Sequence, residues 1–165
     1  MKKNILAILL LCIVMLCGCT DDVKNEHDTE TVNEILNYVN INIKDFQNIE
    51  SRIIKRYNDM EYDIDNENEI IDALKNEILP EYKEHFENLS NVAIKNDEIK
   101  EIHSIYLQSA KYQLEAFELY LSYIENKNYS DLKSVNSKIN SSNEYFKLFK
   151  KSLVEFADKH EIPYN

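Results

Sequence analysis

The stretch Asp97–Asn126, DEIKEIHSIYLQSAKYQLEAFELYLSYIEN, is apolar over most of its surface when it is drawn as a helix. At 100° per residue, its polar residues fall within an arc of about 80°. They are Lys100, Ser104, Gln108, Lys111, Glu115, Glu118, Ser122 and Glu125. Because an ordinary surface helix carries only an apolar stripe, this pattern predicts the most buried helix of the protein. The alternative is a second apolar face that binds a partner.

Three further helices are predicted around this one, over about 31–59, 66–93 and 130–160. Thr31 and Glu34 have the spacing of a capping box at the start of the first. Ser130 is the expected cap of the last. Apolar residues recur at three- and four-residue spacing in each, as helix packing requires. In the first they are Leu36, Val39, Ile43, Phe46, Ile53 and Met60, and in the last Leu132, Val135, Ile139, Ser142, Phe146, Phe149, Leu153 and Phe156.

The predicted fold is therefore all-α. The links between the helices are short, so neighbouring helices should run antiparallel in an up-down-up-down four-helix bundle over residues 31–165. Pro80 lies within the second helix, but the apolar pattern continues through it. We expect a kink at Pro80 rather than a break, because proline removes one backbone donor and clashes with the preceding turn.

The composition excludes several classes of protein. One glycine and two prolines are too few for a turn-rich β fold or a phosphate-binding glycine loop. The net charge is −11, and it becomes more negative by two without Lys2 and Lys3 of the leader. Such a surface repels phosphate backbones, which argues against nucleic-acid binding. About 145 residues after the leader suffice for one domain with a real core.

All three cysteines lie in the first 19 residues, next to an apolar run. Lys2 and Lys3 precede an apolar segment, Ile5 to Leu16, of about 12 residues, whereas a membrane-spanning helix needs roughly 20. The segment ends in Leu16-Cys17-Gly18-Cys19. This ending resembles the lipobox of bacterial lipoproteins, although Cys17 replaces the usual alanine or serine. The alternative is a secreted protein with an ordinary signal peptide, or an N-terminal anchor helix.

The resemblance implies cleavage after residue 18 and a diacylglyceryl group on Cys19. Two acyl chains hold a protein at a membrane far better than one. Residues 1–18 would then be the signal peptide, and polar residues 19–30 a lipidated tether. The mature domain resembles small helical lipoproteins of low-GC Gram-positive bacteria. That resemblance implies a location on the outer, extracytoplasmic face of the cell membrane.

The sequence shows no pattern typical of an enzyme, metal site or cofactor. The di-iron bundle motif Glu-x-x-His is missing at His27, His85, His103 and His160. Glu81 and His85 lie four residues apart, which is the spacing of half a metal site. An exposed helix pair is the simpler interpretation of these two residues. We therefore expect a protein that is not an enzyme and holds no cofactor.

One candidate site is a polar layer inside the bundle. Gln113 and Ser109 lie opposite the polar stripe of the 97–126 helix, so both should face inward. Ser142 falls at nearly the same height, and Asn42 and Asn76 lie near it. We predict that Gln113, Ser142 and Asn42 form a buried polar cluster beside Pro80. Such groups most simply satisfy one another and fix the helix register, and the alternative is a ligand site.

Two functions remain open on the sequence alone. The first is a non-enzymatic interaction module that presents a helical face to an envelope protein. Tyr112 and Tyr123 are then candidate contact residues, while the lysines of the last helix (Lys147, Lys150 and Lys151) are most simply a solvated face. The second is a small-molecule or ion binding protein that uses the polar layer. The sequence does not fix the partner or the oligomeric state.

Overall fold

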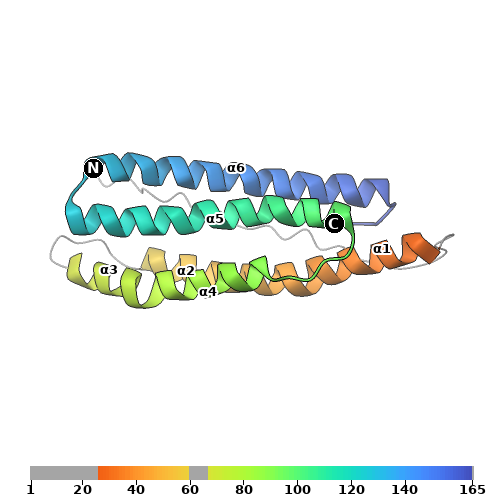
Figure 1. The fold of residues 1–165 in the computed structure, drawn as a ribbon, viewed down its shortest axis with the longest axis horizontal. Coiled ribbons are helices and arrows are strands. Elements are labelled where there is room, and N and C mark those ends of the chain that lie inside the picture. The colour runs from red at the N-terminus through yellow and green to blue at the C-terminus, as the bar shows by residue number, and fades with distance from the viewer. Residues whose placement is uncertain (1–25, 60–66, 165) are drawn as a thin grey trace.

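The computed structural model describes residues 26–59 and 67–164, in which the regular elements are all helical (Figure 1). The all-α class is confirmed. Four helical rods are present in this part of the chain. The first consists of α1 (Glu26–Asn37), the π-helical segment η1 (Tyr38–Ile43) and α2 (Lys44–Asp59). The second consists of α3 (Glu67–Ala73), the π-helical segment η3 (Leu74–Ile78) and α4 (Leu79–Ser90), and the others are α5 (Asp97–Asn126) and α6 (Tyr129–Lys159).

The first rod is already helical at Glu26, so the predicted start at residue 31 was wrong. Thr31 lies inside the helix, where it is buried, and its Oγ1 accepts a hydrogen bond from Asn96 Nδ2 at 3.3 Å. Glu34 Oε1 accepts from the backbone N–H groups of Lys95 and Asn96, at 2.5 and 3.2 Å. These two residues therefore hold the link before α5 instead of capping their own helix.

Local hydrogen bonds define the bounds of α5 and the start of α6. Asn96 Oδ1 accepts from the backbone N–H groups of Glu98 and Ile99, at 2.9 and 3.1 Å, which caps α5. The helix ends where Lys127 adopts φ 53°, in the left-handed region. The cap of α6 is Asn128 rather than Ser130. Asn128 Oδ1 accepts from the backbone N–H of Ser130 at 3.1 Å, a position that a serine two residues later cannot take.

The second rod continues through Pro80 without a break. Ala73 and Leu79, on either side of η3, have right-handed helical angles of φ −62° and φ −65°. Pro80 lies in the first turn of α4, where a missing backbone donor costs least. The turn just before it, Leu74–Ile78, is π-helical. A kink at this point stays a prediction.

α5 lies against each of the other three rods. Its His103 is hydrogen bonded to Tyr38 of the first rod at 3.0 Å, and its Glu118 is paired with Lys83 of the second at 2.8 Å. Ser109 contacts Ser142 of α6. The polar stripe of α5 is exposed or half-buried, whereas the rest of the helix is largely covered.

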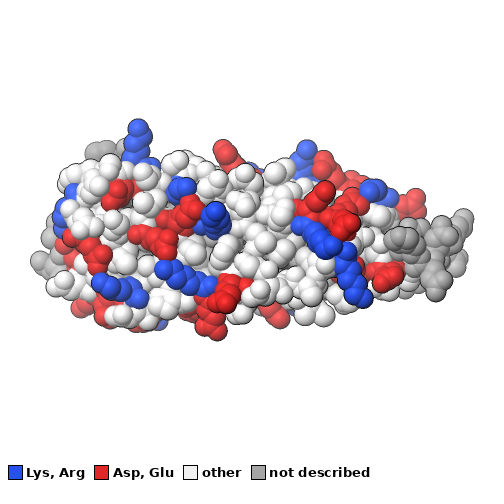
Figure 2. Space-filling view, viewed as in Figure 1, with Lys and Arg blue, Asp and Glu red and all other residues white. Residues whose placement is uncertain are grey.

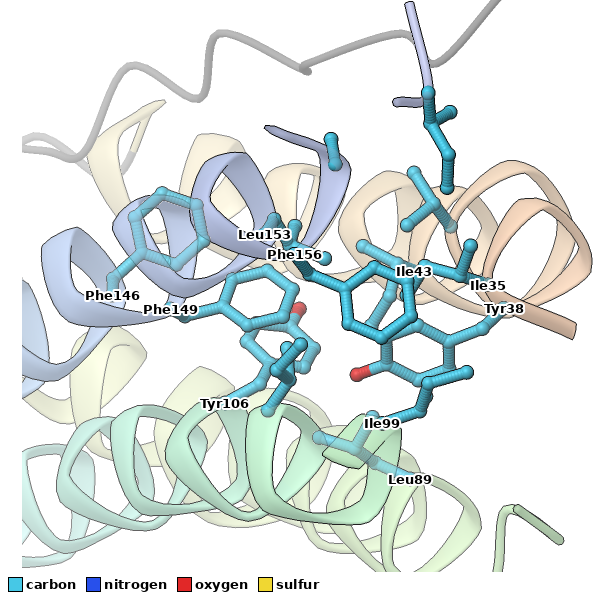
Figure 3. Close-up of a cluster of buried hydrophobic side chains, with 14 of the residues drawn as sticks. Ile35, Tyr38, Ile43, Leu89, Ile99, Tyr106, Phe146, Phe149, Leu153 and Phe156 are labelled. Atoms are coloured by element: carbon cyan, nitrogen blue, oxygen red, sulfur yellow. The ribbon is translucent and has the colours of Figure 1, made fainter. Parts of the chain in front are cut away.

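The apolar core forms two clusters along the molecule. In the first, side chains from α1, η1, α4, α5 and α6 converge, and Figure 3 shows Ile35, Tyr38, Tyr106, Phe149 and Phe156 among them. The Tyr106 and Phe149 rings stack with their centroids 4.9 Å apart. The second cluster is built around Leu74, Tyr82 and Phe117. Tyr82 and Tyr106 thus belong to different clusters, and a single carboxyl group joins them.

The visible surface mixes charges of both signs rather than separating them, as Figure 2 shows. Several pairs bridge the rods, among them Arg52–Glu81, Arg56–Glu77 and Lys138–Glu115. Exposed pairs of this kind contribute only about 0–1 kcal/mol each. Large exposed apolar side chains in the described part of the chain are Ile41, Tyr129, Leu148 and Tyr164. None of them lies on α5, so the described structure gives that helix no open apolar face.

Candidate functional site

The most unusual group in the core is the carboxyl of Glu50 on α2. Only 6% of this residue is exposed. Its Oε1 accepts a hydrogen bond from the Tyr82 hydroxyl of α4 at 3.0 Å. Its Oε2 accepts one from the Tyr106 hydroxyl of α5 at 3.1 Å. Both tyrosines are buried. One carboxyl group therefore joins three rods through hydrogen bonds.

Burial controls the acid–base chemistry of this group. Removal from water raises the pKa of the Glu50 carboxyl, and the hydrogen bonds from Tyr82 and Tyr106 partly offset that rise. Burial, followed by the nearby Glu50, also raises the pKa values of Tyr82 and Tyr106 well above the ordinary tyrosine value. Among the described residues, no salt bridge to Glu50 accompanies these bonds. The site can hold a proton or a negative charge in a nonpolar setting.

A second polar layer lies one helical turn away. Gln47 on α2 and His85 on α4 are 5% and 2% exposed. The Oε1 atom of Gln47 and both ring nitrogens of His85 are buried without a hydrogen-bond partner in the described chain. Aromatic rings hold the imidazole in place, since Phe46 and Tyr82 both contact it edge-on with centroids 5.4 Å apart. Burial lowers the pKa of His85 to about 4, although Glu81 opposes this shift.

The prediction of an exposed Glu81–His85 helix pair was wrong. Glu81 instead pairs with Arg52 across the α2–α4 contact, and His85 turns into the core. The spacing of the apolar residues could have predicted that Glu50 and His85 face the core. Glu50 falls four residues after Phe46 and three before Ile53, on the packing seam of the first rod. His85 falls in the same way between Tyr82 and Leu89.

The structure places most residues of the predicted Gln113 layer in the interior. Gln113, Ser109 and Ser142 are all buried. Ser109 Oγ donates to the Ser142 carbonyl and Ser142 Oγ to the Ser109 carbonyl, both at 2.9 Å. Asn42 is half-buried. The grouping of Gln113, Ser142 and Asn42 as one site stays a prediction.

Asn76 does not belong to that layer. Its side chain is exposed and its Nδ2 donates to Asp72 Oδ1 at 2.6 Å, one turn earlier on the same rod. Asn76 is on the outer face of the second rod, whereas Leu74 and Ile78 on either side are buried.

A second buried histidine is fully hydrogen bonded. His103 Nδ1 contacts the Tyr38 hydroxyl at 3.0 Å, and His103 Nε2 contacts the Leu89 carbonyl at 3.1 Å. Since the carbonyl can only accept, Nε2 carries the proton and Nδ1 accepts from Tyr38. Burial lowers the pKa of His103, although the hydrogen bond to the Leu89 carbonyl opposes this shift. Both ring nitrogens of His103 therefore have hydrogen-bond partners, whereas those of His85 have none among the described residues.

Within residues 26–59 and 67–164, no three His, Cys, Asp or Glu side chains gather closely enough to hold a metal ion. No helix in those same ranges has the length and apolar character needed to cross a membrane. Cys19, the predicted lipidation site, lies outside the described residues.

A family model described as "EMYY-motif containing lipoprotein" matches residues 1–161. The chain belongs to this lipoprotein family. The match covers the apolar leader, the Leu16-Cys17-Gly18-Cys19 ending and the helical domain of the lipoprotein. No curated protein and no solved structure matches the lipoprotein significantly. The family therefore supplies the class of protein, and any specific role must be argued from its residues.

Proposed function

We propose that this lipoprotein is held on the outer face of the cell membrane of a low-GC Gram-positive bacterium by a diacylglyceryl group on Cys19. The family and the lipobox support this proposal. In this setting the protein acts as a non-enzymatic helical interaction module. Its single glycine and the missing Glu-x-x-His motif support a role other than catalysis.

The proposal includes an antiparallel up-down-up-down bundle. Hydrogen bonds and ion pairs support it, because the residue numbers of the bonded partners rise along α5 as they fall along α6. The pairs run from Glu98–Lys159 through Ser109–Ser142 to Ser122–Asp131. Arg52–Glu81 and Arg56–Glu77 give the same order between α2 and α4. Such a bundle is a rigid rod, and α5 alone is about 45 Å long at 1.5 Å per residue.

The rod shape suggests which end meets a partner. Figure 1 places the start of α1 and the link between α5 and α6 at opposite ends. Only six residues separate Cys19 from Glu26, and six extended residues reach at most roughly 20 Å. The α5–α6 link should therefore point away from the membrane. Tyr129 lies there with 77% exposure, and its ring contacts Tyr123 with centroids 6.0 Å apart.

Lipidation is tested first, by mass spectrometry of the mature N-terminus and by membrane fractionation. The expected result is a diacylglyceryl-modified N-terminal Cys19, with the protein in the membrane fraction. Cys19→Ala should abolish the lipid and the cleavage. The matched control is Cys17→Ala, which restores a common lipobox residue and should leave both intact. An unmodified protein that is cleaved and released into the medium would contradict anchoring.

The interaction role is tested by photo-crosslinking in intact cells. A crosslinker at Tyr129 should capture one dominant envelope protein. The control position is Tyr164, which is also exposed but follows the far end of α6. Equal capture at both positions, or capture of nothing, would contradict a partner site at the α5–α6 link.

A second candidate function is binding of a small molecule or ion inside the bundle. The observation that favours it is not the Gln113 layer but Gln47 Oε1 and the two ring nitrogens of His85, which have no partner among the described residues and lie one turn from the Glu50 carboxyl. Thermal unfolding of the full chain with and without a panel of small polar ligands tests it. A ligand that binds only the folded protein would raise the midpoint in proportion to the logarithm of its concentration.

A further inference from the structure

In the layer formed by Gln47 and His85, polar atoms are buried without a hydrogen-bond partner among the described residues. Buried polar groups nearly always have a hydrogen-bond partner, so each exception calls for an explanation. Three of the five such atoms in the described chain belong to these two residues: one carboxamide oxygen and both nitrogens of one imidazole. Both residues are at least nine-tenths buried, so the aqueous surface does not supply the partners.

The pairing of α2 with α4 places the two residues opposite each other. Glu50 is bonded to Tyr82, and one turn further along, Phe46 contacts His85. The residue numbers of the contacting side chains rise along α2 as they fall along α4. In this antiparallel order, Gln47 lies opposite His85. Side chains three residues apart on a helix are neighbours, which also brings Gln47 beside Glu50.

A direct bond does not join Gln47 to His85, since the atoms of both remain unpartnered. The imidazole cannot easily turn to make one, because Phe46 and Tyr82 both contact its ring. A single species that serves both residues would donate to the carboxamide oxygen and bond one imidazole nitrogen. A neutral imidazole offers one donor and one acceptor, so a species that both donates and accepts fits it.

We propose that one buried water molecule bridges Gln47 Oε1 and a ring nitrogen of His85. Water meets the donor and acceptor demands, and it is the smallest species that does so. Proteins hold on the order of one buried water per 27 residues, each with about three hydrogen bonds. This site is independent of the membrane anchor and of the proposed partner.

The test is NMR on the full chain in detergent micelles, with ¹⁵N-labelled histidine. Water-selective cross-relaxation should give a direct peak between a long-lived water and the ring N–H of His85, assigned by its loss in His85→Phe. His103 is the internal control, since both its nitrogens are bonded to protein groups, and its ring should give no direct water peak. If no histidine ring N–H of the unaltered protein gives a direct peak to a long-lived water, the proposal is overturned, and this result requires no variant to fold.

A second variant and a salt exchange separate the alternatives. Gln47→Leu removes the carboxamide and should abolish the His85 water peak, while the His103 signals stay in place as a report of the fold. A peak that survives in Gln47→Leu would overturn the bridge. Replacing NaCl by NH₄Cl at equal ionic strength should leave the unfolding midpoint unchanged. A midpoint that rises with ammonium would assign the site to a cation and also overturn the proposal.

Discussion

The Glu50 carboxylate on α2 accepts a hydrogen bond of 3.1 Å from the hydroxyl of Tyr106 on α5, 56 positions later in the chain. Its other oxygen accepts from Tyr82 on α4. Tyr106 belongs to one apolar cluster and Tyr82 to the other, so this group connects both halves of the core. A buried network in which each member is satisfied makes the packing of the helices specific.

Replacing Glu50 by alanine should destabilise the protein by about 2–4 kcal/mol, because it leaves a cavity and two buried tyrosine hydroxyls without their acceptor. Glu50→Gln retains the shape and an acceptor oxygen, and should cost far less at pH 7. Urea unfolding followed by circular dichroism measures both changes. Equal losses for Glu50→Ala and Glu50→Gln would show that the hydroxyls do not depend on this acceptor.

The effect of Glu50 should depend on pH. Because its pKa is raised in the folded protein, the folded state holds the proton to higher pH than the unfolded state. The stability of the unaltered protein relative to Glu50→Gln should therefore be highest below the ordinary glutamate range, about pH 4.3, and fall as pH rises through the folded pKa. Urea midpoints of both proteins from pH 3.5 to 8 measure this. A difference that grows in the opposite direction would mean that the carboxylate is stabilised by the fold.

The contribution of His85 to stability should change with pH in the opposite direction. Its pKa in the folded protein is about 4, against 6.5 for a free histidine, so the unfolded state takes up the proton first. Stability from this group is complete above pH 6.5 and is lost as pH falls toward 4. His85→Gln should flatten the loss measured over this range. His103→Gln is the matched comparison, because His103 is also buried and its pKa is also lowered. No change of slope in His85→Gln would contradict the burial of a neutral imidazole.

The contact of Ser109 with Ser142 should tolerate small residues and reject large ones. Each hydroxyl donates to the carbonyl of the other residue, so Ser109→Ala and Ser142→Ala should each cost about 0.5–1.5 kcal/mol. Ser142→Leu should cost more, since added carbon atoms in a packed core force the helices apart. Thermal unfolding of these variants measures the difference. The contact would not be closely packed if Ser142→Leu were as stable as Ser142→Ala.

Glu34 should act on the start of α5 rather than on its own helix. Glu34→Ala removes the acceptor for the backbone N–H groups of Lys95 and Asn96 and should cost about 1 kcal/mol, as for the loss of a helix cap. Amide hydrogen exchange at Lys95 and Asn96 should become faster in this variant. Glu30→Ala is the control, since Glu30 is exposed one turn earlier on the same helix. Faster exchange in both variants would assign the effect to the charge of α1 alone.

Much of the fold follows from local patterns. The bounds of α5 matched the expected 97–126, because Asn96 and Asp97 start a helix by local hydrogen bonds and the polar stripe of α5 is uninterrupted. The seam of α6 is buried as predicted from Val135 to Phe156. The leader and Cys19 motif are also local, and they pointed to the lipoprotein class that the family confirms.

The sequence by itself determined the helices, the faces that turn inward and the class of protein, since periodic burial and short motifs act over a few turns. The tertiary structure alone decided what the polar residues on those faces do. Glu50 and His85 occupy seam positions, but their roles depend on Tyr82, Tyr106 and Phe46, which reach them from other helices. Thr31 and Glu34 likewise fit a cap of their own helix, yet they bond to Lys95 and Asn96. A hydrogen bond forms between atoms that meet in space, and helix register across the bundle sets which atoms meet.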